Sequence, residues 1–216
     1  MARIELKKYS LGEELVSSIS HGVGAVWGIV ATIMGILKAV QLENTLMIIS
    51  MSIFGFSLVN LYIMSTIYHA LAINKGKRVF RVLDHCGIFL LIAGTYTPYA
   101  LLVLPRVPGL IILGIVWACA IVGITFNSIN LKKFKVFSLV SYLLTGWVII
   151  FAINHLIANL DLNGLILLVA GGLAYSFGAI IYGIGSKKKY FHSIWHFFVL
   201  LGSILHCLSI YFYVLI

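Results

Sequence analysis

Long apolar runs separated by short polar segments occupy almost the whole sequence. Each run contains the roughly 20 mainly apolar residues that a helix needs to cross a bilayer. The pattern predicts an all-α integral membrane protein with seven transmembrane helices in a single domain over residues 1–216. The expected spans are residues 16–40, 45–72, 83–104, 107–127, 136–157, 163–184 and 192–216. Residues 105–109, between the third and fourth runs, are expected to form a tight turn.

The composition agrees with this pattern. Hydrophobic residues make up 62% of the chain and charged residues 10%, whereas about a quarter of the residues of a soluble domain are charged. The net charge of +9 could suggest a nucleic-acid partner. However, the basic residues stand in short clusters between apolar runs, and basic arms with interleaved aromatics are absent. We therefore expect membrane lipids around the chain and no nucleic acid.

The distribution of basic residues predicts the orientation. Thirteen of the 15 Lys and Arg residues fall on one side of the expected spans, and the other two are Lys38 and Arg106. Cytoplasmic loops carry the excess of Lys and Arg. The N-terminus is therefore expected in the cytoplasm and the C-terminus outside it, as a multi-pass protein of the cell membrane.

Ionisable groups near the cytoplasmic ends of the spans are the candidate functional residues, because such groups are costly in a membrane. His69 leaves the second span, His192 and His196 enter the seventh, and Asp84 begins the third. From the helical rise, all four should lie roughly 5–10 Å below the headgroups. Asp84 is the only acid expected at that depth, since the acidic pair Glu13 and Glu14 is expected to flank the first span.

The spacing of these histidines suits a metal ion. His192 and His196 are four residues apart, so both rings project from one face of a helix. A third histidine from another helix would complete three protein ligands, as in catalytic zinc sites. The spacing leaves two other interpretations open, namely polar packing and a proton path.

Three motifs, in order along the chain, resemble those of the haemolysin III family. They are the first-span segment Glu14-Leu-Val-Ser17-Ser-Ile-Ser-His21, then Ser65-Thr-Ile-Tyr-His69 with Asp84 after it, and His192-Ser-Ile-Trp-His196. This family comprises bacterial relatives of the adiponectin and progestin receptors, within a wider group of membrane hydrolases. The resemblance covers nearly the whole chain. Its bacterial branch is favoured because the chain is short and shows no long N-terminal domain.

The resemblance implies a role for each matching residue. His69, His192 and His196 would bind Zn²⁺, Asp84 would hold a water at the metal site, and Ser65 would orient that water or stabilise an oxyanion. The first-span residues Glu14, Ser17 and His21 would support the site from a second shell. The neighbouring His85 is expected outside the site, and His206 is expected to be a core histidine with its hydrogen bonds satisfied.

Three functions follow as alternatives. The first is a zinc-dependent hydrolase that cleaves an amide or ester bond of a membrane lipid at the inner leaflet. The second is a receptor or sensor of membrane state in which zinc is structural. The third is a lytic, pore-forming protein, which the family name suggests but which the absence of amphipathic segments disfavours.

Overall fold

The computed structural model describes residues 9–184 and 188–216, and within these ranges every regular element is helical. Seven helices are long and apolar enough to cross a membrane, which confirms the predicted fold class. Spans one to four are α1 (Leu11–Gln41), α2 (Thr45–Ala70), α3 (Lys75–Pro98) extended by the π-helical turn η1 (Tyr99–Val103), and α4 (Arg106–Asn130). The remaining three are α5 (Lys135–Gly146) with the 3₁₀ turn η2 (Val148–Ala152) and α6 (Ile153–Asn159), α7 (Leu162–Ile184), and α8 (Phe191–Ser209) with the π-helical turn η4 (Ile210–Val214).

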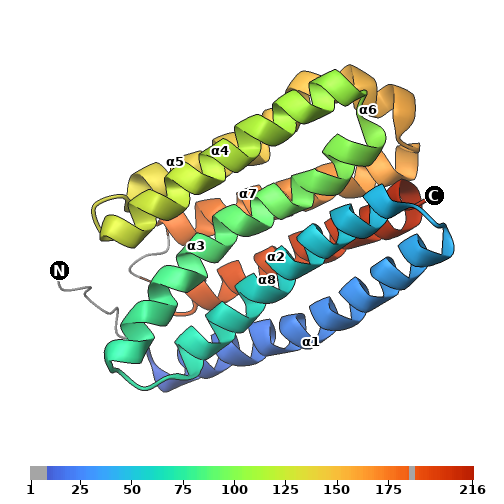
Figure 1. Ribbon diagram of the computed structural model, residues 1–216. Coiled ribbons are helices and arrows are strands. Elements are labelled where there is room, and N and C mark those ends of the chain that lie inside the picture. Colours follow the sequence, from blue (N-terminus) through green and yellow to red (C-terminus); the bar gives the residue numbers. More distant parts are fainter. Residues whose placement is uncertain (1–8, 185–187) are drawn as a thin grey trace.

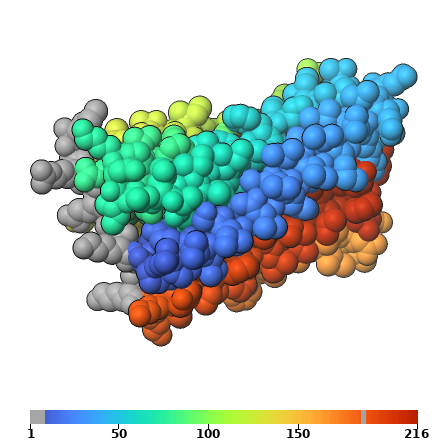
Figure 2. Space-filling model, turned by 90° about the horizontal axis from the view of Figure 1, so that it is seen from below, coloured from blue at the N-terminus to red at the C-terminus, as the bar shows by residue number. Residues whose placement is uncertain are grey.

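The helices run side by side as an elongated bundle (Figure 1). On the face shown in Figure 2, α1 lies between α2 and α8, so the first and last spans are neighbours. The helix α3 packs against α2 and α4 and is the most buried of the seven spans. At the end of the bundle where α1 begins, α1, α2, α3 and α8 can therefore bring residues from distant parts of the chain together.

Local capping explains where several helices begin. The Ser10 hydroxyl accepts a hydrogen bond from the Glu13 backbone N–H, and the Glu13 carboxylate accepts one from the Ser10 backbone N–H. This reciprocal capping box starts α1 at Leu11, five residues before the expected boundary. Asn44 and Asn74 cap α2 and α3 through side-chain oxygens that accept from backbone N–H groups.

Two local expectations differ from the structure. The turn between the third and fourth spans is shorter than expected, because α4 already begins at Arg106 and only residues 104 and 105 connect the two spans. The fifth span is not one continuous α-helix, because a 3₁₀ turn replaces α-helical bonding between Val148 and Ala152. After this turn, α6 completes the span.

The start of α1 and the end of α8 lie at opposite ends of the bundle (Figure 1), as an odd number of spans requires. The last residues of α2, α4 and α7 lie at the same end of the bundle as the start of α1. Which end faces the cytoplasm remains a prediction from the basic residues. Four of those residues, Arg3, Lys7, Lys8 and Lys187, lie outside the described residues.

Candidate metal centre

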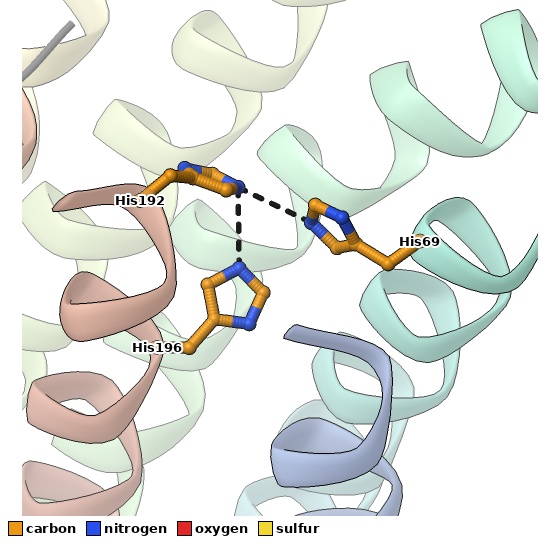
Figure 3. A group of neighbouring side chains, drawn as sticks. All are labelled: His69, His192 and His196. Carbon is orange, nitrogen blue, oxygen red and sulfur yellow. Dashed lines mark hydrogen bonds between the residues drawn. The ribbon is translucent and has the colours of Figure 1, made fainter. Parts of the chain in front are cut away.

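Three histidines from two helices converge at the end of the bundle where α1 begins (Figure 3). His69 occupies the last turn of α2, whereas His192 and His196 occupy successive turns at the start of α8. The Nε2 atom of His192 lies 3.2 Å from the Nε2 atoms of both His69 and His196. All three side chains are buried. We call these residues the histidine triad.

The geometry of the histidine triad fits a metal ion with nitrogen ligands. One ligand atom from each histidine lies within 4.8 Å of the other two. With metal–nitrogen bonds of 2.0–2.1 Å, tetrahedral zinc would hold two nitrogens about 3.3 Å apart, close to the observed 3.2 Å. Neutral imidazoles placed this closely cannot all make good hydrogen bonds to one another. A shared cation would use all three lone pairs at once.

The Glu14 carboxylate and the Lys77 amine support His69 on the side of the ring away from the other two histidines. The Nδ1 atom of His69 lies 2.7 Å from Glu14 Oε2, so Nδ1 donates its hydrogen and Nε2 keeps its lone pair for a ligand. The other oxygen of Glu14 accepts from Lys77 Nζ at 2.7 Å, and Lys77 also donates to the Leu71 carbonyl. Such carboxylate–histidine pairs fix the tautomer and orientation of a metal ligand. Glu14 therefore lies where a second-shell residue is expected.

Asp84 and Ser65 lie together beside the triad. Asp84 is buried on α3, with Oδ2 3.5 Å from His85 Nδ1. Ser65 is fully buried one turn before His69. Its hydroxyl lies near the Asp84 carboxylate, but no hydrogen bond of good geometry joins it to a described residue. The Asp84 carboxylate and the Ser65 hydroxyl therefore lie next to the converging nitrogens.

The other two first-span residues contact α8. The rings of His21 and His196 stack with centroids 3.8 Å apart, and neither nitrogen of His21 has a hydrogen-bond partner among the described residues. Ser17 Oγ lies 3.0 Å from Ser193 Oγ, and Ser193 also donates to the Glu13 carbonyl. Ser17 therefore holds α1 against α8, whereas His21 packs directly on a triad ring.

Comparisons with known proteins agree with the motifs. The model of the family described as "Haemolysin-III related" matches residues 9–207. "Hemolysin-3" of Bacillus cereus is 40% identical over 94% of this chain and 92% of its own length. "Hemolysin-3 homolog" of Bacillus subtilis (strain 168) is 39% identical over 95% of this chain and 96% of its own. The chain belongs to the haemolysin III family.

A more distant human relative of this haemolysin III protein is "Monocyte to macrophage differentiation factor". It is 27% identical over 74% of the chain and 68% of its own length. The match to the family model begins at Tyr9 and ends at Cys207, so it includes the triad, Asp84, Ser65 and the first-span motif. With its seven apolar helices, this haemolysin III protein is a multi-pass membrane protein.

Some contacts around the triad differ from the sequence-based expectations. Asp84 is not the only acid at this depth, because Glu14 reaches His69 from the first turn of α1. His85 was expected outside the site, yet it pairs with Asp84 and also places Nδ1 2.9 Å from the Arg81 carbonyl. Glu14 reaches this depth because the first turn of α1 lies beside the last turn of α2, where it contacts His69.

Two further residues of the centre carry no clear signal in the sequence. Lys77 is one of several basic residues expected on the cytoplasmic side, but its side chain is 2% exposed and binds Glu14. The Tyr9 ring stacks on His192, with centroids 4.9 Å apart. Burial raises the pKa of the Tyr9 hydroxyl, so this phenol adds no charge beside the triad. Glu14, at the start of the first span, is the sequence feature that could have indicated a buried cation, because a buried acid needs a partner.

Two cavities adjoin the centre in this haemolysin III protein. The smaller, about 30 Å³, lies among His21, Asp84, His85 and His192, and we call it the polar pocket. The larger, about 280 Å³, extends between α3, α5, α7 and α8, and we call it the apolar cavity. They share wall residues from α2, α3, α5 and α8: Leu61, Ile88, Tyr142, Trp195 and Val199. The polar pocket is therefore adjacent to a space large enough for part of a hydrocarbon chain.

The apolar cavity opens on the outer surface of the bundle. Ile150, in the 3₁₀ turn η2, and Val169, on α7, both line the cavity, and they are 54% and 38% exposed. In a membrane this surface faces lipid, because α5 and α7 are spanning helices. The mouth therefore lies between η2 and α7, at the position where the fifth span is broken.

Proposed function

We propose that this haemolysin III protein is a zinc-dependent hydrolase that cleaves an amide or ester bond of a membrane lipid at the inner leaflet. The observation that carries the proposal is the convergence of three Nε2 atoms beside a carboxylate and a hydroxyl. Three neutral histidines with one open position are typical of catalytic zinc. Zinc bound there would make hydroxide available near neutral pH and polarise a carbonyl.

The protein's own groups have separate roles in this proposal. Asp84 holds the attacking water and takes its proton, which is then passed to the departing amine or alcohol. Ser65 donates its hydroxyl hydrogen to the oxygen that becomes negative at the carbonyl, since no described group occupies that hydroxyl. Water supplies OH to the acyl carbon and H to the leaving group, so the carbon–nitrogen or carbon–oxygen bond is broken. Glu14 keeps His69 oriented throughout.

The apolar cavity supports a lipid substrate. Its mouth faces the bilayer, so an acyl chain can move sideways into the bundle without crossing water. Its walls adjoin the polar pocket, so a linkage near the headgroup can reach Asp84 while the chain stays in an apolar space. Burial of each additional methylene favours such binding by about 0.8 kcal/mol.

The test is hydrolysis by purified protein whose zinc content has been measured. Wild type, zinc-stripped wild type, Asp84→Asn and Ser65→Ala are incubated with a panel of amide- and ester-linked lipids. We expect turnover to fall about 10²–10⁴-fold in Asp84→Asn and about 10²–10³-fold in Ser65→Ala, with zinc retained in both. Matched controls are Asp161→Asn, in the loop at the opposite end, and Ser50→Ala, whose buried hydroxyl bonds only within α2.

The outcomes separate the proposal from its alternatives. If wild type cleaves no lipid faster than the zinc-stripped protein, the hydrolase is wrong and a membrane-state sensor with structural zinc takes its place. If wild type cleaves and Asp84→Asn matches it, the hydrolase stands but the role given to Asp84 is wrong. The printed names of the bacterial relatives suggest lysis, which leakage of dye-filled vesicles treated with the same protein would detect.

A further inference from the structure

Polar side chains in the wall of the apolar cavity fall into two groups. Most have hydrogen-bond partners within the protein, as shown by Tyr96 with the Gly146 carbonyl and Trp147 with Ser176. The same holds for Thr95, Tyr142, Tyr175 and Ser176. Two wall atoms, the Tyr99 hydroxyl and His206 Nδ1, are buried and make no hydrogen bond of good geometry with a described residue, although the Tyr99 hydroxyl lies near the Ser209 side chain. Buried polar groups are rarely left in this state, so these two atoms need an explanation.

The hydrogen bond made by His206 Nε2 determines whether Nδ1 is a donor or an acceptor. Nε2 lies 3.0 Å from the Leu168 carbonyl, which can only accept, so Nε2 carries the hydrogen. In a neutral imidazole, Nδ1 then bears a lone pair and needs a donor. The ring is held close to α7, where a Cβ at Gly171 would lie 2.5 Å from its Cδ2. His206 is therefore a fixed acceptor, only half satisfied, rather than the fully satisfied core histidine expected from the sequence.

Tyr99 lies in the same part of the cavity. It begins the π-helical turn η1, and the second π-helical turn, η4, starts four residues after His206. Single π-helical turns occur frequently at functional sites. The ring of Tyr175 lies 5.3 Å from that of His206 and also interacts with Tyr99. The unpartnered donor and the unpartnered acceptor therefore belong to one group of side chains.

This group is far from the histidine triad. His206 follows His196 by ten residues on α8, which corresponds to about 15 Å of helical rise. The hydrocarbon core of a bilayer is about 30 Å thick, so His206 lies roughly half a membrane away from the triad. Trp195 and Val199 line both the apolar cavity and the polar pocket, so the cavity connects the two levels along α8.

We propose that Tyr99 and His206 form a subsite for a hydroxyl group carried partway along an acyl chain. The ligand hydroxyl would donate its hydrogen to His206 Nδ1 and accept one from the Tyr99 hydroxyl. A plain hydrocarbon chain would leave both protein atoms unsatisfied. The inference rests on the proposed function in one respect, which is that an acyl chain enters the apolar cavity. It does not require that the bond near the triad is cleaved.

The test compares the binding of free fatty acids to the full-length, zinc-loaded protein. The probes are octadecanoic acid and a series of hydroxyoctadecanoic acids with the hydroxyl at successive positions. We expect the affinity to reach a maximum for a hydroxyl near the middle of the chain. Each hydrogen bond gained should strengthen binding by roughly 2- to 10-fold over octadecanoic acid. The measured quantity is the affinity for a hydroxyoctadecanoic acid divided by the affinity for octadecanoic acid. A general effect of a variant on the cavity changes both affinities and cancels in this ratio.

Variants isolate the two atoms. Tyr99→Phe and His206→Gln should bring the ratio close to one, because Gln reaches the Nε2 position and restores no acceptor at Nδ1. His206→Asn should retain the preference, because its shorter amide reaches the Nδ1 position. Tyr96→Phe is the matched control, since it removes a wall hydroxyl that already has partners. Zinc content and thermal stability verify that each variant is folded.

Two results would overturn the subsite: equal binding of all the acids by wild type, or a preference that survives in both Tyr99→Phe and His206→Gln. A water held between the two atoms would give the first result. Failure of the proposed hydrolase is distinguishable, because the binding ratio is measured without turnover. If the protein cleaves lipids but binds all the acids equally, the proposed hydrolase stands and the subsite is wrong. If it prefers the hydroxylated acids but cleaves no lipid, the subsite stands and the hydrolase is wrong.

Discussion

The polar pocket and the apolar cavity share part of their walls, yet they are held in different ways. Around the polar pocket, hydrogen bonds connect α1 to α2, α3 and α8 through Glu14, Lys77 and Ser17. Around the apolar cavity, the fifth span is broken, and exposed residues of η2 and α7 form an opening. The comparison indicates that the chemical groups are fixed, whereas the space for a ligand depends on how closely two spans approach.

The side of the membrane on which the polar pocket lies can be tested with reporter fusions, and the result is all-or-none. Because 13 of the 15 basic residues are counted on the side of the polar pocket, a reporter fused after Ile216 should read as extracytoplasmic. A matched fusion in the loop between α2 and α3 should read as cytoplasmic. Two independent reporters that both place Ile216 in the cytoplasm would reverse the arrangement and put the polar pocket at the outer leaflet.

Removing two ligands should abolish the metal centre and leave the cavity. We expect wild type to hold about one zinc per chain and the double variant His192→Ala with His196→Ala to hold none, because one histidine cannot retain the ion. Metal analysis of purified protein measures this. Fatty-acid binding by the same variant should persist, since neither residue lines the apolar cavity. Stoichiometric zinc in the double variant would remove these histidines from the site.

Weakening the support behind a ligand should have an intermediate effect. Glu14→Gln replaces the carboxylate that contacts His69 Nδ1 and should reduce zinc affinity by about 10–100-fold. Competition with a chelator of known affinity gives this value. Glu43→Gln is the matched control, because it removes the same charge from an exposed position beyond the other end of α1. Wild-type affinity in Glu14→Gln would mean that the carboxylate does not support the ligand.

Filling the apolar cavity should have the smallest effect and leave the metal unchanged. Gly146 lines this cavity, and a Cβ added there meets nothing within 4 Å. Gly146→Leu should weaken binding of long acyl chains by about 10-fold, as expected when a pocket loses room for a methylene group. Gly114→Leu on α4 is the control, because a Cβ there also meets open space but does not line the cavity. Equal binding by both variants would indicate that chains do not use this space.

The sequence predicted the spans well because the thickness of a bilayer imposes a length on every apolar run. It also predicted that His69, His192 and His196 would meet, since helical spacing and depth determine which groups share a level. Their zinc and the catalytic roles of Asp84 and Ser65 remain predictions. Lys77 and Tyr9 were not found, because their contacts depend on how the ends of separate helices approach one another.

The apolar cavity could not be derived from the pattern of residues. The fifth span is mainly apolar, and nothing in its periodicity marks the 3₁₀ turn at Val148–Ala152. The space lies beside Gly146 and is lined in part by residues of η2 and α6. The same limit applies to His206, because only its packing against Gly171 and Leu168 shows which nitrogen lacks a partner.

The separation between His69 and His192 along the chain, 123 residues, has a consequence for biogenesis. At a synthesis rate of about 5–20 residues per second, His69 emerges from the ribosome roughly 6–25 s before His192. The second span is therefore already in the bilayer while the last span does not yet exist. If the triad binds zinc as proposed, all three histidines can hold the ion only after the final span has inserted, so we expect uptake of the ion to mark completion of the chain. Cells deprived of zinc should then accumulate newly made chains that are inserted but not closed at the end of the bundle where α1 begins.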